Sequence, residues 1–152
     1  MTLHAQSTPQ PPKHSIPWCD LFDTQDVLMA TGPNTWICVL AVRGRWYAVR
    51  GDQRHPIQRL AIGDRQNCMS VAEMWFRQYA PSEIALIQHW MVCPASPKQC
   101  KRLSPLLHAD TPLTRYEASA RLQFQFNAAT IVRLVNAASS APAACSVSAE
   151  AL

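Results

Sequence analysis

Glycine is scarce in this chain of 152 residues, which contains four glycines against twelve prolines. Connections rich in proline are stiff, and no glycine-rich loop of the kind that cradles phosphates is present. Charged residues are also few, because they make up 16% of the chain against roughly 25% in an average soluble domain. So little surface charge indicates that a partner covers part of the surface.

Long apolar runs, a signal sequence and ordered catalytic motifs are absent as well. The longest uninterrupted apolar run covers the seven residues 36–42, whereas a membrane helix needs roughly 20. No cationic start is followed by an apolar stretch, so we expect no secretory signal and a soluble, cytoplasmic protein. The six cysteines are then expected to be thiols or metal ligands rather than disulfides. Carboxylates are scattered and no nucleophile motif occurs, so we expect no enzymatic activity.

The composition along the chain predicts one folded domain between two tails. Residues 1–16 are polar and rich in proline, and residues 138–152 contain almost no bulky apolar side chains. Both segments are therefore expected to be disordered. Residues 17–137 are long enough to bury a core as a single domain, and we find no internal repeat in them.

The central apolar stretch predicts a β-hairpin over residues 36–50. Two apolar runs flank Arg43-Gly44, which we take as the turn. With that turn, alternate residues fall on two faces that are both apolar, so the strands should be covered on both sides. A further, edge-like strand is expected at 56–62, whereas residues 23–30 fit either a short helix or a first strand.

Helical patterns follow the strands. Ser70-Val71-Ala72-Glu73 matches a capping box, in which the Ser and Glu side chains satisfy free amide groups at the start of a helix. Pro81 suits the first turn of a second helix. These two signals predict a helical hairpin over 70–92. The proline-rich residues 94–112 should form a loop or linker without regular helix.

Residues 113–136 are ambiguous between helix and strand. Thr114 and Glu117 form another capping-box pattern, but residues 122–126 alternate like a strand. We favour a break near Asn127, which would cap a last helix. The elements together predict an α+β fold, in which a small antiparallel sheet packs with a helical hairpin and a C-terminal helix.

Four residues near the end of the helical hairpin have side chains that zinc prefers, namely His89, Cys93, Cys100 and His108. His89 and Cys93 are four residues apart and share a helix face if the helix persists. The spacing from Cys93 to Cys100 is too long for a zinc knuckle, and no CxxC pair occurs. Ordinary packed or exposed cysteines are the alternative that we favour, so no cofactor is expected.

Arginine is concentrated in the middle of the chain. Residues 43–65 contain six arginines and two aspartates, a net charge of +4. The planar guanidinium group suits bidentate contact with phosphate or carboxylate. Trp46 and Tyr47 lie among these arginines, and aromatic faces with neighbouring arginines bind single strands on many sheet surfaces. For Trp46 we favour a place in the core, and for any single arginine simple solvation is the alternative.

The segment LTRYEASARLQFQFNAATIVRLVNAAS resembles bacterial repressor-type helix-turn-helix segments. The matching positions are Leu113-Thr114, Glu117-Ala118 and residues 130–136. The middle of the segment is about two residues longer than the usual turn, and Gln-Phe replaces the glycine of that turn. The resemblance implies that Thr130 and Arg133 would face the groove of DNA.

We therefore predict a non-catalytic nucleic-acid-binding regulator or accessory protein. Its phosphate contacts would come from Arg43, Arg45, Arg50, Arg54, Arg59 and Arg133. The alternative is a protein–protein interaction module, such as an inhibitor, an adaptor or a homo-oligomer, with or without a zinc staple. The low charge, the five tryptophans and the two-sided hairpin favour that alternative. The expected partner is nucleic acid or an acidic protein surface, and no membrane.

Overall fold

A five-stranded antiparallel sheet forms the centre of the computed structural model, which describes residues 16–107 and 111–140. Each strand pairs with the next one along the chain, an arrangement that needs only short connections and costs little loop entropy. The predicted α+β class is confirmed. The strands are β1 (Cys19–Asp20), β2 (Val27–Thr31), β3 (Thr35–Val42), β4 (Arg45–Asp52) and β5 (Gln58–Gly63).

The predicted hairpin is formed by β3 and β4. Arg43 and Gly44 have φ angles of 54° and 76°, the left-handed conformation that a two-residue type I′ turn requires at both central positions. The register places Val39 opposite Ala48, as the predicted turn requires. Cys38 and Val39 point to opposite faces and are both fully buried, so the hairpin is covered on both sides.

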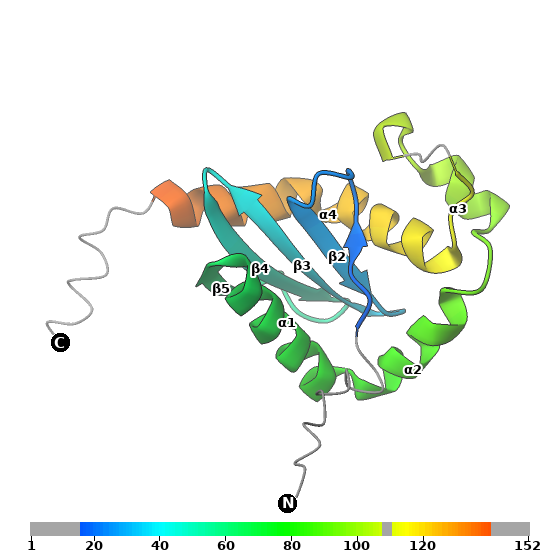
Figure 1. Ribbon diagram of the computed structural model, residues 1–152, viewed down its shortest axis with the longest axis horizontal. Coiled ribbons are helices and arrows are strands. Elements are labelled where there is room, and N and C mark those ends of the chain that lie inside the picture. Colours follow the sequence, from blue (N-terminus) through cyan, green and yellow to red (C-terminus); the bar gives the residue numbers. More distant parts are fainter. Residues whose placement is uncertain (1–15, 108–110, 141–152) are drawn as a thin grey trace, which may run out of the picture.

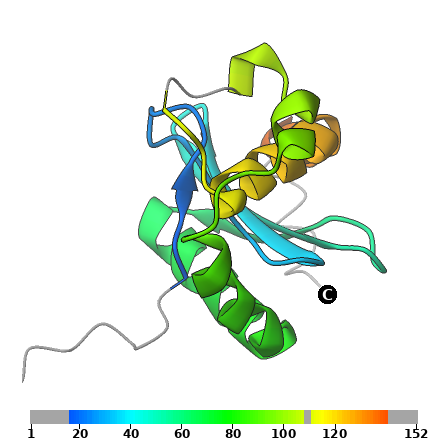
Figure 2. The same ribbon diagram turned by 90° about the vertical axis from the view of Figure 1, so that its right-hand side faces the viewer.

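One helix covers each face of the sheet. The helix α1 (Arg65–Tyr79) contacts β3, β4 and β5, and α4 (Arg115–Ser140) contacts β2, β3 and β5 from the other side (Figure 1). Figure 2 shows the sheet between these two helices. Phe76 of α1 and Ile131 of α4 are fully buried against it. Burial of each such side chain stabilises the fold by about 1.5–3 kcal/mol.

The helical hairpin consists of α1 and α2 (Pro81–Trp90), with Pro81 in the first turn of α2 as predicted. The start of α1 differs from the prediction. Asp64 is its N-cap and accepts a hydrogen bond of 2.8 Å from the amide of Asn67. Ser70 lies inside the helix, so the capping box predicted there is wrong. Aspartate caps a helix as well as serine does, and Asp64 follows β5 directly.

A short helix interrupts the proline-rich segment that we expected to lack regular helix. Pro97 opens α3 (Pro97–Arg102), at a position where the missing amide of proline costs nothing. Ser96 and Gln99 form a complete capping box at its start. A 3₁₀ turn, η1 (Pro105–Leu107), follows α3.

The expected break near Asn127 is wrong, because α4 is one helix of 26 residues. Its predicted capping box is confirmed, since the amide of Glu117 donates to the hydroxyl of Thr114 at 3.1 Å. Leu122 packs into a small second core with Leu103, away from the main core under the sheet. Burial on two sides explains why the apolar residues of α4 do not form one stripe.

The predicted tails fall almost entirely outside the described residues. Ile16, at the end of the first expected tail, is buried in the main core, and α4 continues to Ser140. The division into one domain with two tails stays a prediction. Within residues 16–107 and 111–140, no helix is both long and apolar enough to cross a membrane.

Close packing between Gly51 and Trp36 provides a test of the hairpin. The two residues are paired across β3 and β4, and a Cβ atom on Gly51 would overlap the indole ring. Trp36 is 3% exposed, so the atoms packed around it restrict the movement of its ring. We expect Gly51→Ala to lower the free energy of unfolding by about 2–3 kcal/mol in a urea titration.

The matched control is Gly44→Asn at the turn. A Cβ atom there meets nothing within 4 Å, and asparagine tolerates the left-handed conformation, so the expected loss is below about 1 kcal/mol. A loss for Gly51→Ala no larger than that of the control would contradict the described packing of the hairpin.

Candidate nucleic-acid interface

The predicted arginines lie at two ends of the sheet and on α4, rather than along one edge. The strand β4 spans eight residues, so its ends are separated by roughly 23 Å. Arg43 and Arg45 are exposed at the β3–β4 turn, and Arg133 is exposed on α4. Arg50 lies near the far end of β4, Arg54 in the connection to β5, and Arg59 near the start of β5.

Arg50 belongs to a group of rings and charges at this far end. Its guanidinium carbon lies 4.9 Å from the centre of the Trp75 ring. The Trp75 and Tyr79 rings are stacked, with centres 4.8 Å apart and planes 14° apart. Tyr79 also meets His55 edge to face. We call this group the loop-end cluster, and its members are Arg50, Asp52, Arg54, His55, Trp75 and Tyr79.

The residues that α1 and β4 contribute to the cluster meet because of the regular repeat of side chains along a helix and along a strand. Trp75 and Tyr79 are four residues apart in α1 and therefore lie one above the other on the same face. Arg50 alternates onto the same face of β4 as Ala48, which α1 covers. Neither ring was predicted as a site residue, because aromatic side chains on an amphipathic helix are typical of core packing. Arg50 is two residues from Ala48 in the strand, so their side chains point to the same face of the sheet. This alternation is the signal in the sequence that could have placed Arg50 beneath the helix.

The carboxylate of Asp52 organises the connection between β4 and β5. Its side chain is 4% exposed, and it accepts hydrogen bonds of 2.7 Å from the amides of both Arg54 and His55. Its Oδ2 atom also lies 3.1 Å from His55 Nδ1. These contacts fix the loop that carries Arg54 beside the stacked rings.

Two opposing effects set the pKa of Asp52. Burial acts to raise it, but the Tyr79 hydroxyl, the amides of Arg54 and His55 and the His55 ring donate hydrogen bonds to the carboxylate. Together these donors hold the pKa of Asp52 well below its usual range. The same hydrogen bond raises the pKa of Tyr79. Asp52 is therefore ionised, and the Tyr79 hydroxyl protonated, at neutral pH.

The cluster presents an aromatic face beside positive charge. Tyr79 is 44% exposed, and Arg54 is exposed on the adjoining loop. Arg50 and Arg54 both act electrostatically on the Tyr79 hydroxyl. Stacking of one nucleobase on an exposed aromatic ring contributes about 1–3 kcal/mol. The arrangement is therefore able to hold a base on Tyr79 and a phosphate on Arg54.

The aromatic residues of the hairpin itself have a different role. Tyr47 is fully buried, and Trp46 packs against the core with only part of its ring accessible. Arg65, at the start of α1, lies over the Trp46 ring with its guanidinium carbon 5.8 Å from the ring centre. Tyr47 is thus unable to stack on a base, and the core position favoured for Trp46 agrees with its packing.

The structure brings two of the four candidate zinc ligands together. His89 Nε2 and Cys93 Sγ lie 3.5 Å apart, and Cys100 is exposed on α3. His108 lies outside the described residues. In the part of the chain that the structure describes, no group of three or more His, Cys, Asp or Glu side chains is arranged to hold a metal.

The resemblance to a helix-turn-helix segment is not realised. The segment forms the continuous helix α4 from Arg115 onward, and this helix has no turn between its halves. Thr130 is half-buried, whereas Arg133 is exposed. Arg133 therefore stays a phosphate-binding candidate as a surface cation, without the groove-reading role that the resemblance implies.

The Asp52 contacts predict a pH-dependent contribution to stability. Because the native pKa lies below the ordinary value of 3.8, the stabilisation is complete above about pH 4 and is lost as the pH falls further. We expect Asp52→Asn to lower the free energy of unfolding by about 1–2 kcal/mol at pH 7. The difference from the natural protein should shrink in denaturant titrations below pH 4.

The control for this prediction is Asp26→Asn, which neutralises an exposed carboxylate. Its effect should stay within about 0.5 kcal/mol at all pH values. If Asp52→Asn were as mild as Asp26→Asn at pH 7, the carboxylate would not organise the loop.

Comparison with known proteins identifies a family for the chain. The family model described as the mitochondrial helicase Irc3, C-terminal domain, matches residues 14–140. No curated protein matches the chain, and no solved structure does. The description of this family names a mitochondrial helicase, so the cytoplasmic location that we predicted is not confirmed. Because the match covers most of its length, the chain belongs to the family of the mitochondrial helicase Irc3 C-terminal domain.

Proposed function

We propose that this domain binds single-stranded nucleic acid without catalysing a reaction, as an accessory part of helicase action. The observation that carries the proposal is the loop-end cluster, in which the exposed Tyr79 ring stacks on Trp75 beside two arginines. Membership of a helicase-domain family supports the same class of ligand. A cytoplasmic location stays a prediction.

Binding combines charge neutralisation with base stacking. Arg54 and Arg59 are exposed around the β4–β5 connection and meet phosphates, with release of condensed counterions. A base then lies on Tyr79. Base faces are exposed in single strands and hidden in duplexes, so an open aromatic face favours the single strand. Arg43, Arg45 and Arg133 extend the positive surface at the other end of the sheet and on α4.

The residues of the domain also support a role without catalysis. The ionised carboxylate of Asp52 is occupied by the amides of its own loop, and its side chain is nearly inaccessible. His55, the neighbouring base, is paired with the same carboxylate. The Asp52 carboxylate is thus not free to take a proton from a substrate, and the cluster acts as a rigid binding surface.

Charge-neutralising variants test the phosphate contacts. We expect Arg54→Gln with Arg59→Gln to weaken binding to a labelled single-stranded oligonucleotide about 10-fold or more near 0.1 M salt. The slope of log affinity against log salt should fall by about 1.4, because each phosphate contact on a single strand contributes about 0.7. Fluorescence anisotropy across a salt series measures both quantities.

The control is Lys98→Gln with Lys101→Gln on α3, which removes the same two positive charges from an exposed helix away from the sheet. Its affinity and salt slope should remain close to those of the natural protein. If both double variants lost the same affinity, the loss would come from the change in net charge and not from contacts made by Arg54 and Arg59. Absence of binding by the natural protein even at low salt would refute the proposed function.

Substitutions of Tyr79 test the stacking. Tyr79→Ala removes the exposed ring and should weaken single-strand binding by about 1–3 kcal/mol, with the salt slope unchanged. Tyr79→Phe keeps the ring and removes only the hydroxyl, so it should bind nearly as well as the natural protein. If Phe were as weak as Ala, the hydroxyl and its bond to Asp52 would matter, and a base would not rest on the ring.

A further inference from the structure

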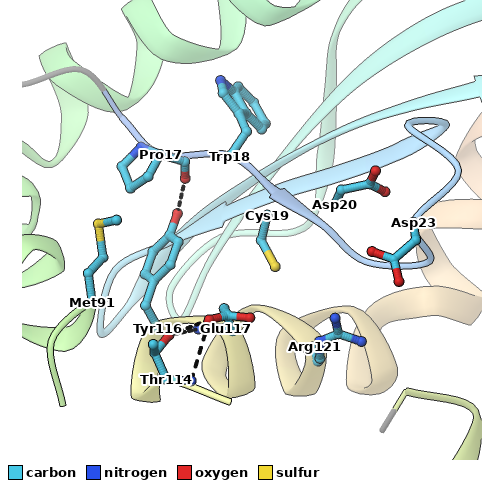
Figure 3. A pocket seen from close by; sticks show the side chains of 10 residues that line it. All are labelled: Pro17, Trp18, Cys19, Asp20, Asp23, Met91, Thr114, Tyr116, Glu117 and Arg121. Carbon is cyan, nitrogen blue, oxygen red and sulfur yellow. Dashed lines mark hydrogen bonds between the residues drawn. The ribbon is translucent and has the colours of Figure 1, made fainter. Parts of the chain in front are cut away.

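A second site lies between β1 and α4, at the edge of the sheet opposite β5. It is a cavity of about 400 Å³ whose walls come from β1, the residues beside it, the end of α2 and the first turns of α4. Figure 3 shows Cys19 pointing from β1 toward α4 within it. Its charged lining residues are Asp20 and Asp23 on the strand side and Glu117 and Arg121 on the helix side (Figure 3).

The charges around this cavity do not balance. Three carboxylates face one guanidinium group, which leaves a net charge of −2 when all four are ionised. All four act electrostatically on the Cys19 thiol, so they lie within reach of one point. Burial raises the pKa of that thiol to about 11, and the neutral thiol adds no charge. The cavity therefore attracts cations and repels phosphates.

Two polar atoms in the lining lack hydrogen-bond partners. Arg121 is 6% exposed, and its Nη1 donates to the carbonyls of Leu21 and Leu107 at 3.0 and 2.9 Å. Arg121 Nε and Asp20 Oδ1 are buried and unpaired, and they are the two such side-chain atoms among the described residues. Each unpaired buried group costs about 1–3 kcal/mol. A ligand that satisfies both atoms must offer an acceptor and a donor.

We propose that the cavity receives a basic side chain, arginine or lysine, from a protein partner. The cationic head group pairs with Asp20 and Asp23, and a backbone carbonyl of the same segment accepts from Arg121 Nε. Met91 lines the same cavity and provides apolar surface for the methylene stem. A nucleotide also carries donors and acceptors, but its phosphate would face the three carboxylates. The proposal does not depend on nucleic-acid binding at the loop-end cluster.

The probe for this site is N-acetyl-L-arginine methylamide, titrated into the ¹⁵N-labelled full chain and followed by NMR. The reporters are the side-chain N–H signal of Arg121 and the backbone amide signal of Cys19, because both residues line the cavity. We expect saturable shifts of both signals. The citrulline analogue, which has nearly the same shape without the charge, should bind about 10-fold more weakly or not at all.

Two substitutions in the loop after β1 localise the effect. Asp23 has a φ of 57°, a conformation that asparagine also tolerates, so Asp23→Asn removes charge without straining the backbone. We expect it to weaken binding of the arginine probe about 3- to 10-fold. Asp26→Asn, an exposed change in the same loop outside the cavity lining, should leave binding unchanged.

Three results would overturn the proposal. One is the absence of saturable shifts with the arginine probe. Another is equal binding of the citrulline and arginine probes. The third is tighter binding of guanosine monophosphate than of the arginine probe at the same two signals, which would assign the cavity to a nucleotide.

Discussion

Burial of the β3–β4 hairpin on both faces is the constraint on which the rest of the structure depends. Adjacent residues such as Cys38 and Val39 point in opposite directions and are equally inaccessible, so neither face is available to water. One cover comes from α1 and the other from α4. Both covers are necessary, because a hairpin with one bare apolar face would expose a surface that favours association.

This arrangement decides where charged groups are able to lie. With both faces of the sheet covered, most arginines lie at turns, strand ends and the outer surfaces of helices. Arg121 is buried, and its Nη1 donates to two backbone carbonyls. Arg50 sits at the boundary: it is on the α1 face of β4, but close enough to the end of the strand to lie over Trp75. The packing of α1 on the sheet therefore forms the loop-end cluster. The packing of α4 beside β1, at the opposite edge, forms the cavity lined by Asp20, Asp23 and Arg121. We infer that the basic surface meets nucleic acid and the acidic cavity meets a basic protein segment.

Local patterns predicted much of the fold. The hairpin turn at Arg43-Gly44, the first turn of α2 and the Thr114–Glu117 capping box depend on residues within a few positions of each other, and all are present. Errors arose where tertiary contacts outweigh local preference. Residues 122–126 alternate like a strand, but α4 is buried on two sides there. The site was harder to predict, because Arg50 and Trp75 are distant in sequence and meet only once α1 lies on the sheet. The cavity residues Asp20, Asp23 and Arg121 were not predicted for the same reason.

The most direct measurement of the central claim is photo-cross-linking of the protein to a bromouracil-substituted single-stranded oligonucleotide, with the linked residues identified by mass spectrometry. Two aromatic side chains exposed elsewhere offer a built-in comparison, namely Phe22 on the loop after β1 and Phe126 on α4. The account predicts that cross-links concentrate on Tyr79, Trp75 and His55. Cross-links on Phe22 or Phe126 with none on the loop-end cluster would contradict it.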